Sequence, residues 1–140
     1  MTVPDCLRRF GLHVQSAALP EIRLLLEDET RLETERQGRG DTGLMKLFAV
    51  QLFGVGELDD VLRIWAAKTA SMDSDGSIDV QLLCGAGLNV TKAFLGKSPV
   101  PAAAVALKRI LACEDSGDFI DFSPEALRKD YEDYYAKALQ

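Results

Sequence analysis

The segment from residue 56 to residue 95 constrains the fold most, because it contains two helix patterns with more apolar surface than either helix can hide alone. Its sequence is GELDDVLRIWAAKTASMDSDGSIDVQLLCGAGLNVTKAFL. It holds the only tryptophan, Trp65, and an apolar run punctuated by glycine. We interpret it as two helices joined by an acidic turn, and we expect the rest of the chain to pack against this pair.

The first of these helices has one apolar face. Leu58, Val61, Leu62 and Trp65 recur at three- and four-residue spacing, which is the pattern of an amphipathic helix. Acidic residues stand in its first turn, where the helix dipole favours negative charge. We expect the Trp65 side chain to be largely buried.

The second helix is predicted to start near Asp79 and is apolar on nearly all sides from residue 80 to residue 84. Gly85-Ala-Gly87 then offers either a break or a surface where another backbone comes close, and the helix can resume through Leu95. This sequence lacks the spacing of a dinucleotide-binding fingerprint and the Lys-Ser/Thr of a P-loop. Close helix packing is therefore the favoured interpretation.

The acidic turn between the two helices resembles a calcium-binding loop that lacks both end ligands. With Gly76 at the sixth position of an EF-hand loop, the third, fifth and ninth positions are Asp73, Asp75 and Asp79. The first position is Ser71, and the twelfth, which should supply a bidentate glutamate, is Leu82. We interpret the segment as a helix-to-helix turn, in which Gly76 permits a positive φ and Ser77 or Asp79 caps the next helix. We predict no metal site.

Residues 44 to 53, LMKLFAVQLF, are apolar almost throughout, so we expect their helix at the centre of the core. Further helices are predicted to start at Pro20, Pro101 and Ser123-Pro124, because proline is favoured in the first turn of a helix. Residues 37 to 43, QGRGDTG, are predicted to be a flexible linker. The length of 140 residues predicts a single domain.

The chain is acidic, with a net charge of −6 and no basic block. This charge argues against nucleic acid as a main partner and favours the surface of a basic protein. No apolar run reaches the roughly eighteen residues of a membrane span, and the N-terminus lacks the layout of a signal peptide. Cys6, Cys84 and Cys113 have no paired spacing, so we expect reduced thiols and a cytoplasmic protein.

The predicted helix starts near Glu57, Asp79, Pro101 and Ser123 lie about 22 residues apart, so a helical hairpin would repeat about every 44 residues. This matches the unit of HEAT-type helical repeats, which is about 40–47 residues long. A compact helical bundle accommodates the same helix lengths. We therefore predict an all-α fold of six to seven helices, packed as a HEAT-like repeat unit or as a compact bundle.

Three sequence blocks carry a resemblance to a known group of proteins. They are GELDDVL followed by IWAAK, then IDVQLLCGAGL from Ile78, and the closing FSPEAL with Tyr131, Tyr134 and Tyr135. Together they resemble a group of short, uncharacterised bacterial helical proteins over roughly residues 43 to 135. The resemblance implies a compact, all-α, HEAT-like unit, and it brings no activity or catalytic residues.

The favoured function is a small acidic interaction module of the cytosol, a class that includes inhibitors and immunity-type proteins. Its binding surface is expected near the C-terminus, where acids alternate with aromatic rings. The predicted contact residues are Asp118, Phe119, Asp121, Phe122, Tyr131 and Tyr134. Exposed rings supply contact area, and the acids steer a basic partner. The alternative, which we favour for the rings themselves, is that they only close the C-terminal end of the core.

A second function class stays open, namely a small-molecule-binding protein or an enzyme with a site near the central helix pair. Its candidate residues are the polar side chains that flank the acidic turn: Arg63, Lys68, Asp79 and Gln81. They form no known catalytic motif, and Arg63 and Lys68 are five residues apart, so they do not share a tight helical face. We therefore favour a binding protein over an enzyme, and we predict no cofactor.

Overall fold

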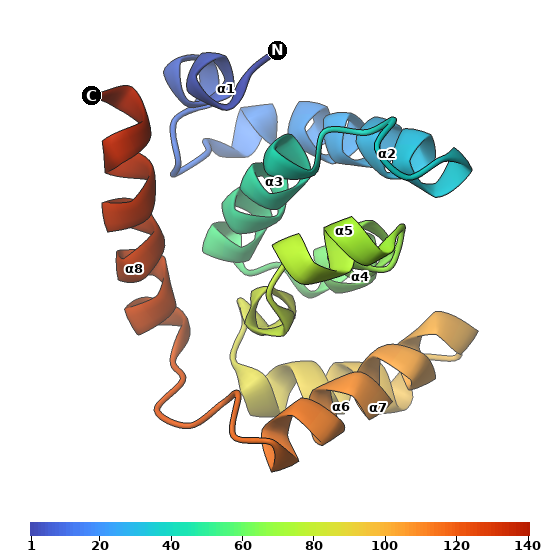
Figure 1. Ribbon diagram of the computed structural model, residues 1–140. Coiled ribbons are helices and arrows are strands. Elements are labelled where there is room, and N and C mark those ends of the chain that lie inside the picture. Colours follow the sequence, from blue (N-terminus) through green and yellow to red (C-terminus); the bar gives the residue numbers. More distant parts are fainter.

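The computed structural model describes residues 1–140 and is entirely helical, as predicted (Figure 1). The eight α-helices are α1 (Val3–Phe10), α2 (Leu19–Glu35), α3 (Thr42–Val55), α4 (Val61–Lys68), α5 (Met72–Ser77), α6 (Leu88–Lys97), α7 (Pro101–Asp115) and α8 (Pro124–Ala136). Three short 3₁₀ helices lie between them, η1 (Ser16–Ala18), η2 (Leu58–Asp60) and η3 (Val80–Cys84), and a fourth, η4 (Lys137–Leu139), follows α8. No helix combines the length and the apolar character needed to cross a membrane.

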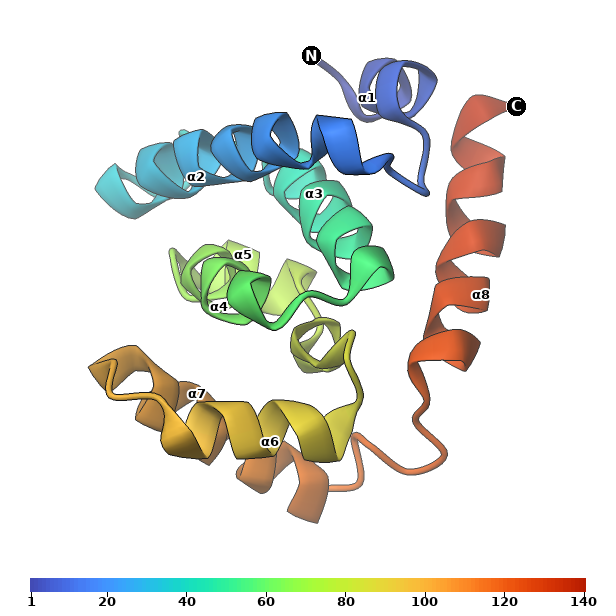
Figure 2. The same cartoon turned by 180° about the vertical axis from the view of Figure 1, so that it is seen from behind.

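Helix α3 lies at the centre of the molecule. Helix α2 crosses it on one side, while α5 and η3 cover another. Helix α4 packs against α2, α5 and η3, and the α6–α7 hairpin packs beyond α4. Helix α8 runs along the edge of this stack and contacts α3 (Figures 1 and 2). Both termini lie at the same end of the molecule, beside α1.

The central position of α3 follows from its sequence and confirms the predicted core. Every residue from Leu47 to Phe53 is buried. The one polar residue in this run, Gln51, donates from Nε2 to the carbonyl oxygen of Gly11 at 2.8 Å, so its burial leaves the amide satisfied. Asp41 caps the helix by accepting a hydrogen bond from the Leu44 amide at 3.0 Å.

The predicted number of helices was too low, because the acidic turn is itself a helix. The Ser71 hydroxyl accepts from the Ser74 amide and the Ser74 hydroxyl accepts from the Ser71 amide, each at 3.0 Å, which closes a reciprocal cap on α5. Gly76 therefore lies inside a helix rather than at a positive φ. Neither Ser77 nor Asp79 caps the next element through its side chain.

The expected second helix is broken into η3 and α6, and close backbone packing explains the break. A Cβ atom on Gly85 would lie 2.4 Å from the carbonyl oxygen of Phe53, so only glycine fits there. Gly56 ends α3 in the left-handed conformation, with φ of 78°, and its Cα faces Gly85. The two segments thus meet backbone to backbone at the end of α3.

Arg128 on α8 stabilises this contact between the end of α3 and the segment around Gly85. Its Nε donates to the carbonyl oxygen of Gly54 and its Nη2 to that of Gly85, each at 3.2 Å. The guanidinium also lies 5.5 Å from the centre of the Phe53 ring. These contacts fix the first half of α8 against the end of α3.

The glycine-rich segment predicted as a linker connects α2 to α3, and helix α3 begins within it at Thr42. Buried Glu33 accepts hydrogen bonds from the amides of Gly38 and Gly40 at 2.9 and 3.1 Å and from the Ser71 hydroxyl at 2.6 Å. The Ser71 hydrogen bond and then the two amides hold the pKa of Glu33 below its usual value. One carboxylate therefore joins α2, the loop and α5.

The repeat of helical hairpins stays a prediction, and the last two helices of the chain, α7 and α8, lie apart (Figures 1 and 2). Helices α6 and α7 pack side by side, but residues 116–123 carry the chain away from α7. Helix α8 then returns along α3 towards α1 (Figures 1 and 2).

Trp65 is 5 % exposed, as expected, and the Arg109 guanidinium lies 5.4 Å from its ring centre. We predict that Trp65→Ala lowers the free energy of unfolding by about 3–5 kcal/mol, because it leaves a cavity in the core. Urea denaturation measures the change. Met72→Ala is the control, since Met72 is 86 % exposed and should cost almost nothing. A solvent-like fluorescence maximum for folded wild-type protein would contradict the burial.

Candidate functional site

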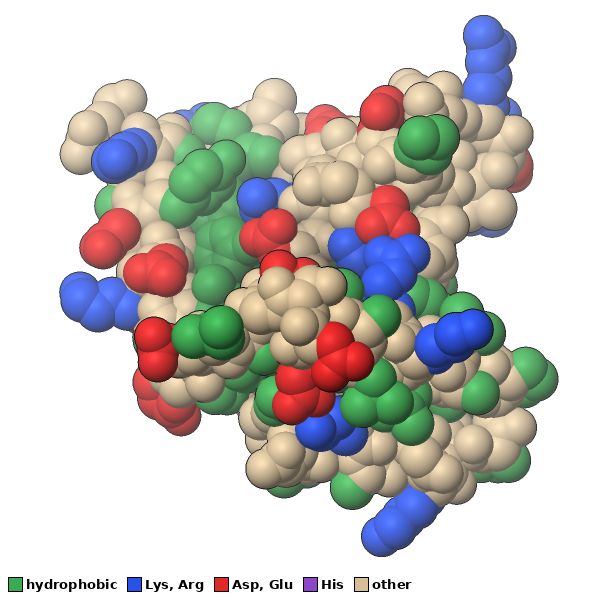
Figure 3. Space-filling view, turned by 60° about the horizontal axis from the view of Figure 1, so that its bottom comes forward, with side chains coloured by type: hydrophobic (Ala, Val, Ile, Leu, Met, Phe, Trp, Pro, Cys, Tyr) green, Lys and Arg blue, Asp and Glu red, His purple; other side chains and the backbone are tan.

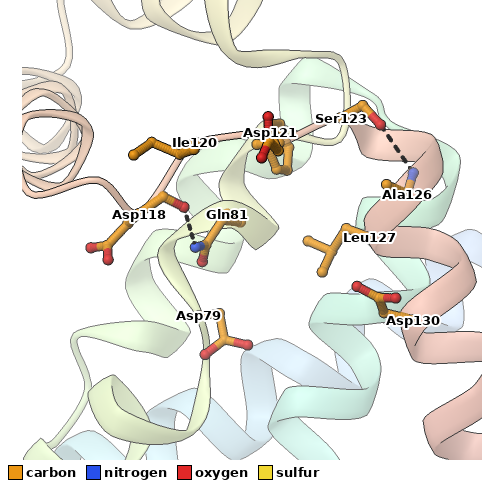
Figure 4. A pocket seen from close by; sticks show the side chains of 10 residues that line it. Asp79, Gln81, Asp118, Ile120, Asp121, Ser123, Ala126, Leu127 and Asp130 are labelled. Atoms are coloured by element: carbon orange, nitrogen blue, oxygen red, sulfur yellow. Dashed lines mark hydrogen bonds between the residues drawn. The ribbon is translucent and has the colours of Figure 1, made fainter.

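A pocket of about 370 Å³ opens between η3, the loop 116–123 and the first half of α8 (Figure 4). Ten residues line it: Asp79, Gln81, Asp118, Ile120, Asp121, Phe122, Ser123, Ala126, Leu127 and Asp130. We call it the acidic pocket, because four of these residues are aspartates and none is a lysine, arginine or histidine.

Local hydrogen bonds shape the wall formed by the loop. The side-chain nitrogen of Gln81, Nε2, donates to the backbone carbonyl oxygen of Asp118 at 2.7 Å and thereby holds the loop against η3 (Figure 4). Gly117 and Asp121 turn the loop, each with a positive φ. Ser123 then starts α8 by accepting from the Ala126 amide at 3.1 Å, as the sequence predicted (Figure 4).

The four aspartates of the acidic pocket have no cationic partner within the protein. Asp79, Asp118, Asp121 and Asp130 form no ion pair. The only side-chain partner of Asp79 is the hydroxyl of Tyr131, which donates to Oδ2 at 2.7 Å. Burial and then the Asp79 carboxylate raise the pKa of Tyr131. The pocket therefore concentrates negative charge and attracts cations.

Apolar side chains border these carboxylates. Ile120 is 75 % exposed at the rim, and Phe122 and Leu127 are half-buried beside it. Figure 3 shows several acidic side chains gathered, with apolar ones between them, on the side of the molecule where α8 lies. A long cationic side chain could place its head among the aspartates and its aliphatic stem against the rim.

The structure brings together part of the predicted interaction surface. Asp118, Asp121 and Phe122 line the acidic pocket. The expectation that Phe119 and Tyr131 are exposed is wrong, since both are buried in the core. Phe119 packs edge-to-face on Phe122, with 5.4 Å between ring centres, so these rings do close the C-terminal end of the core.

Tyr134, the last residue of that predicted surface, is 58 % exposed but faces a different groove. It lies one helical turn after Asp130, the one acidic residue of the pocket that the sequence analysis missed. Ser123, Ala126, Leu127 and Asp130 follow the spacing of a single helix face. That spacing is the signal that could have identified Asp130.

The four residues of the alternative ligand site do not form one site. Asp79 and Gln81 line the acidic pocket, whereas Arg63 and Lys68 are bound elsewhere. Arg63 pairs with Glu27 at 2.8 Å and with Asp60, far from the pocket lining. Periodicity had already placed Arg63 and Lys68 on different faces, and the structure separates both from Asp79 and Gln81.

Lys68 is almost fully buried, and protein groups use its ammonium. Its Nζ donates to the carbonyl oxygens of Asp75 and Ile78 and lies 3.0 Å from the Asp75 carboxylate. Arg109 grips the same carboxylate with two hydrogen bonds of 3.0 and 3.1 Å. Arg109 and then Lys68 hold the pKa of Asp75 below its usual value. This cluster joins α4, α5 and α7 and leaves Lys68 no free donor.

The residues of the calcium-like loop are dispersed by helix α5. Asp75 is engaged by Lys68 and Arg109, and Asp79 by Tyr131. No three His, Cys, Asp or Glu side chains in the protein are grouped closely enough to hold a metal ion.

The cysteines offer no activated nucleophile. Cys6 and Cys84 are buried, and burial raises the pKa of the Cys84 thiol to about 12. Cys113 is half-buried, and its pKa is raised by burial and by the Asp118 carboxylate. The only histidine, His13, lies 3.1 Å from Glu132 on the surface.

Comparison with models of known protein families, with curated proteins and with solved structures found no significant match. The acidic pocket is therefore interpreted from its own geometry and charge.

The Asp75 cluster predicts a pH dependence of stability. The carboxylate has a pKa of 3.8 in the absence of neighbours and a lower value in the folded protein. Its stabilising effect is therefore present above about pH 4 and is lost as the pH falls through the lowered pKa. Asp75→Asn should lower the unfolding free energy at pH 7 by about 1–3 kcal/mol and flatten the decline in acid.

Denaturation between pH 2 and pH 7 measures this effect. Asp73→Asn is the matched control, because Asp73 is exposed and forms no ion pair. If the unfolding free energy of wild type and of Asp75→Asn falls equally steeply in acid, other carboxylates determine the loss of stability.

Proposed function

We propose that this protein is an interaction module that binds a basic segment of a partner protein through the acidic pocket. The observation that carries the proposal is the set of four aspartates without a cationic partner, which line one pocket with no basic residue. In this proposal a lysine or arginine side chain of the partner enters the pocket and supplies the missing charge.

The dimensions and chemistry of the pocket support this ligand. Its volume of about 370 Å³ lies near the lower end of the range of small ligand pockets. Asp79 and Asp130 border it on opposite sides (Figure 4), so a guanidinium or ammonium that enters between them would be attracted to both carboxylates. Ile120 and Leu127 would cover the aliphatic stem.

The net charge of −6 adds a second, longer-range contribution. An acidic protein attracts a basic partner during diffusion, which raises the association rate more than the final affinity. A cytosolic location, a HEAT-like arrangement of the helices, and a role as an inhibitor or immunity-type protein stay predictions that this proposal accommodates.

The second candidate is binding of a small organic cation in the same pocket. It is favoured by the position of Asp79 and Gln81, two of the residues expected at a small-molecule site, in the lining. A polyamine would satisfy several aspartates at once. The two candidates differ in the size of the ligand and share the aspartates.

The test is a charge change in the pocket followed by capture of partners from a cell extract. Asp118→Lys reverses one negative charge at the rim of the acidic pocket, and Asp121→Asn removes a second one. Asparagine is chosen for position 121 because Asp121 has a φ of 58°, which asparagine tolerates and lysine does not. The fold should be retained, since exposed charges contribute little to stability.

We expect this double variant to lose at least about tenfold in the partner captured, corresponding to about 1.4 kcal/mol or more. Asp73→Lys combined with Asp133→Asn is the control with the same change in charge, because both residues are exposed and unpaired. Retention of the partner by the pocket variant would refute the proposed site, and a loss in both variants would indicate non-specific charge attraction. Saturable binding of spermidine, with no basic protein captured, would select the small-cation candidate.

A further inference from the structure

Lys46 is the only half-buried cation of the protein that has no ionic partner. The other lysines and arginines without an ion pair are exposed: Arg36, Lys97, Lys108, Lys129 and Lys137. Lys46 is also the only charged residue of the apolar run in α3. A charge that is partly removed from water without a counter-ion is costly, so other groups must stabilise the Lys46 ammonium.

Two tyrosine rings from α8 surround the Lys46 ammonium. Its Nζ lies 5.3 Å from the ring centre of Tyr134 and 5.7 Å from that of Tyr131. Cation–π attraction offsets part of the cost of burial. Ring faces do not replace the oxygen acceptors that an ammonium binds in water, so its N–H donors remain open towards solvent.

The ammonium borders a groove of about 680 Å³ between the starts of α1 and α3, the end of α5, and α8 with η4. Its side chains with polar groups are those of Thr42, Lys46, Ser77, Tyr134, Tyr135 and Lys137, and none is a carboxylate. Each of the four other principal pockets has at least one aspartate or glutamate in its lining. In a protein of net charge −6, this groove is a local exception with two lysines.

Further donors at this groove are uncommitted. The amides of Thr42 and Gly43, in the first turn of α3, have no acceptor within the protein. The Ser77 hydroxyl makes only a long contact of 3.5 Å to the Thr42 carbonyl oxygen. The nearby Asp41 carboxylate is occupied by the Leu44 amide and does not line the groove.

We propose that this groove binds a phosphate monoester with a flat, ring-containing body. The phosphate lies between Lys46 and Lys137, within reach of the Thr42 and Ser77 hydroxyls, and its two negative charges match the two ammonium groups. The ring packs against Tyr134, which is 58 % exposed. A volume of about 680 Å³ suits a ligand of this size.

This inference does not depend on the proposed function, because the two sites share no lining residue. The acidic pocket takes a cation, and the Lys46 groove takes an anion. A failure of either binding experiment therefore leaves the other conclusion untouched.

The test is calorimetric titration of the whole chain with adenosine monophosphate at fixed ionic strength, with inorganic phosphate and adenosine as separate probes. We expect saturable binding of adenosine monophosphate, and weaker binding of each part alone. Binding should also raise the Tm in proportion to ligand occupancy. Lys46→Met should weaken the affinity at least about tenfold, since it removes the charge and keeps the length of the side chain.

Lys108→Met is the matched control, because Lys108 is exposed on α7, has no ion pair and lies outside the groove. It should bind like the wild type. Lys137→Met is a second test variant, at an exposed position where the core is not disturbed. We expect it to weaken binding of the nucleotide about threefold. Absence of saturable binding at millimolar adenosine monophosphate, or wild-type affinity in Lys46→Met, would overturn the proposal. Equal affinity for phosphate and the nucleotide would overturn the packing of the ring against Tyr134.

Discussion

The backbone contact between the end of α3 and Gly85 is the constraint on which the rest of the architecture depends. Because no side chain separates Phe53 from Gly85, η3 comes close enough to α3 to bury Leu82, Leu83 and Cys84. The same approach leaves the carbonyl oxygens of Gly54 and Gly85 free to accept hydrogen bonds from Arg128. The position of α8, and with it one wall of the acidic pocket, follows from a site where only glycine fits.

Ion pairs with little exposure to solvent then fix the positions of the short helices relative to their neighbours. Asp60 is fully buried and accepts from Arg23 on α2 and from Arg63 on α4, while Lys68 and Arg109 converge on Asp75. No buried side-chain nitrogen or oxygen atom lacks a hydrogen-bond partner. Since unpaired buried charge is expensive, these clusters specify one arrangement of the helices rather than add much net stability.

Local signals in the sequence predicted the parts of the fold that depend on neighbouring residues. The helix start at Ser123 and the burial of Trp65 are set within one or two helical turns. Helix α5 escaped prediction because its cap pairs two serines, Ser71 and Ser74, instead of the more familiar serine and glutamate.

The candidate site was predicted in two unconnected halves. Asp118 and Asp121 were expected at a protein interface, and Asp79 and Gln81 at a ligand site. Their union depends on the side chain of Gln81 donating to the carbonyl oxygen of Asp118, 37 residues later in the chain, and on the path of the loop after α7. Such contacts leave no periodic pattern in the sequence. Long-range contacts likewise place Tyr131 inside the core, where it was expected to be exposed.

Helix α8 carries Leu127 and Asp130 towards one pocket and Tyr134 towards another, while Arg128, Tyr131 and Tyr135 anchor it to the body of the protein. If the helix detaches, both pockets lose a wall together. Thermodynamic linkage then requires that an occupant of either pocket, by favouring the attached state, strengthens binding in the other by the same factor. Such cooperativity needs no contact between the two occupants, only a shared equilibrium between the attached and the detached state of α8.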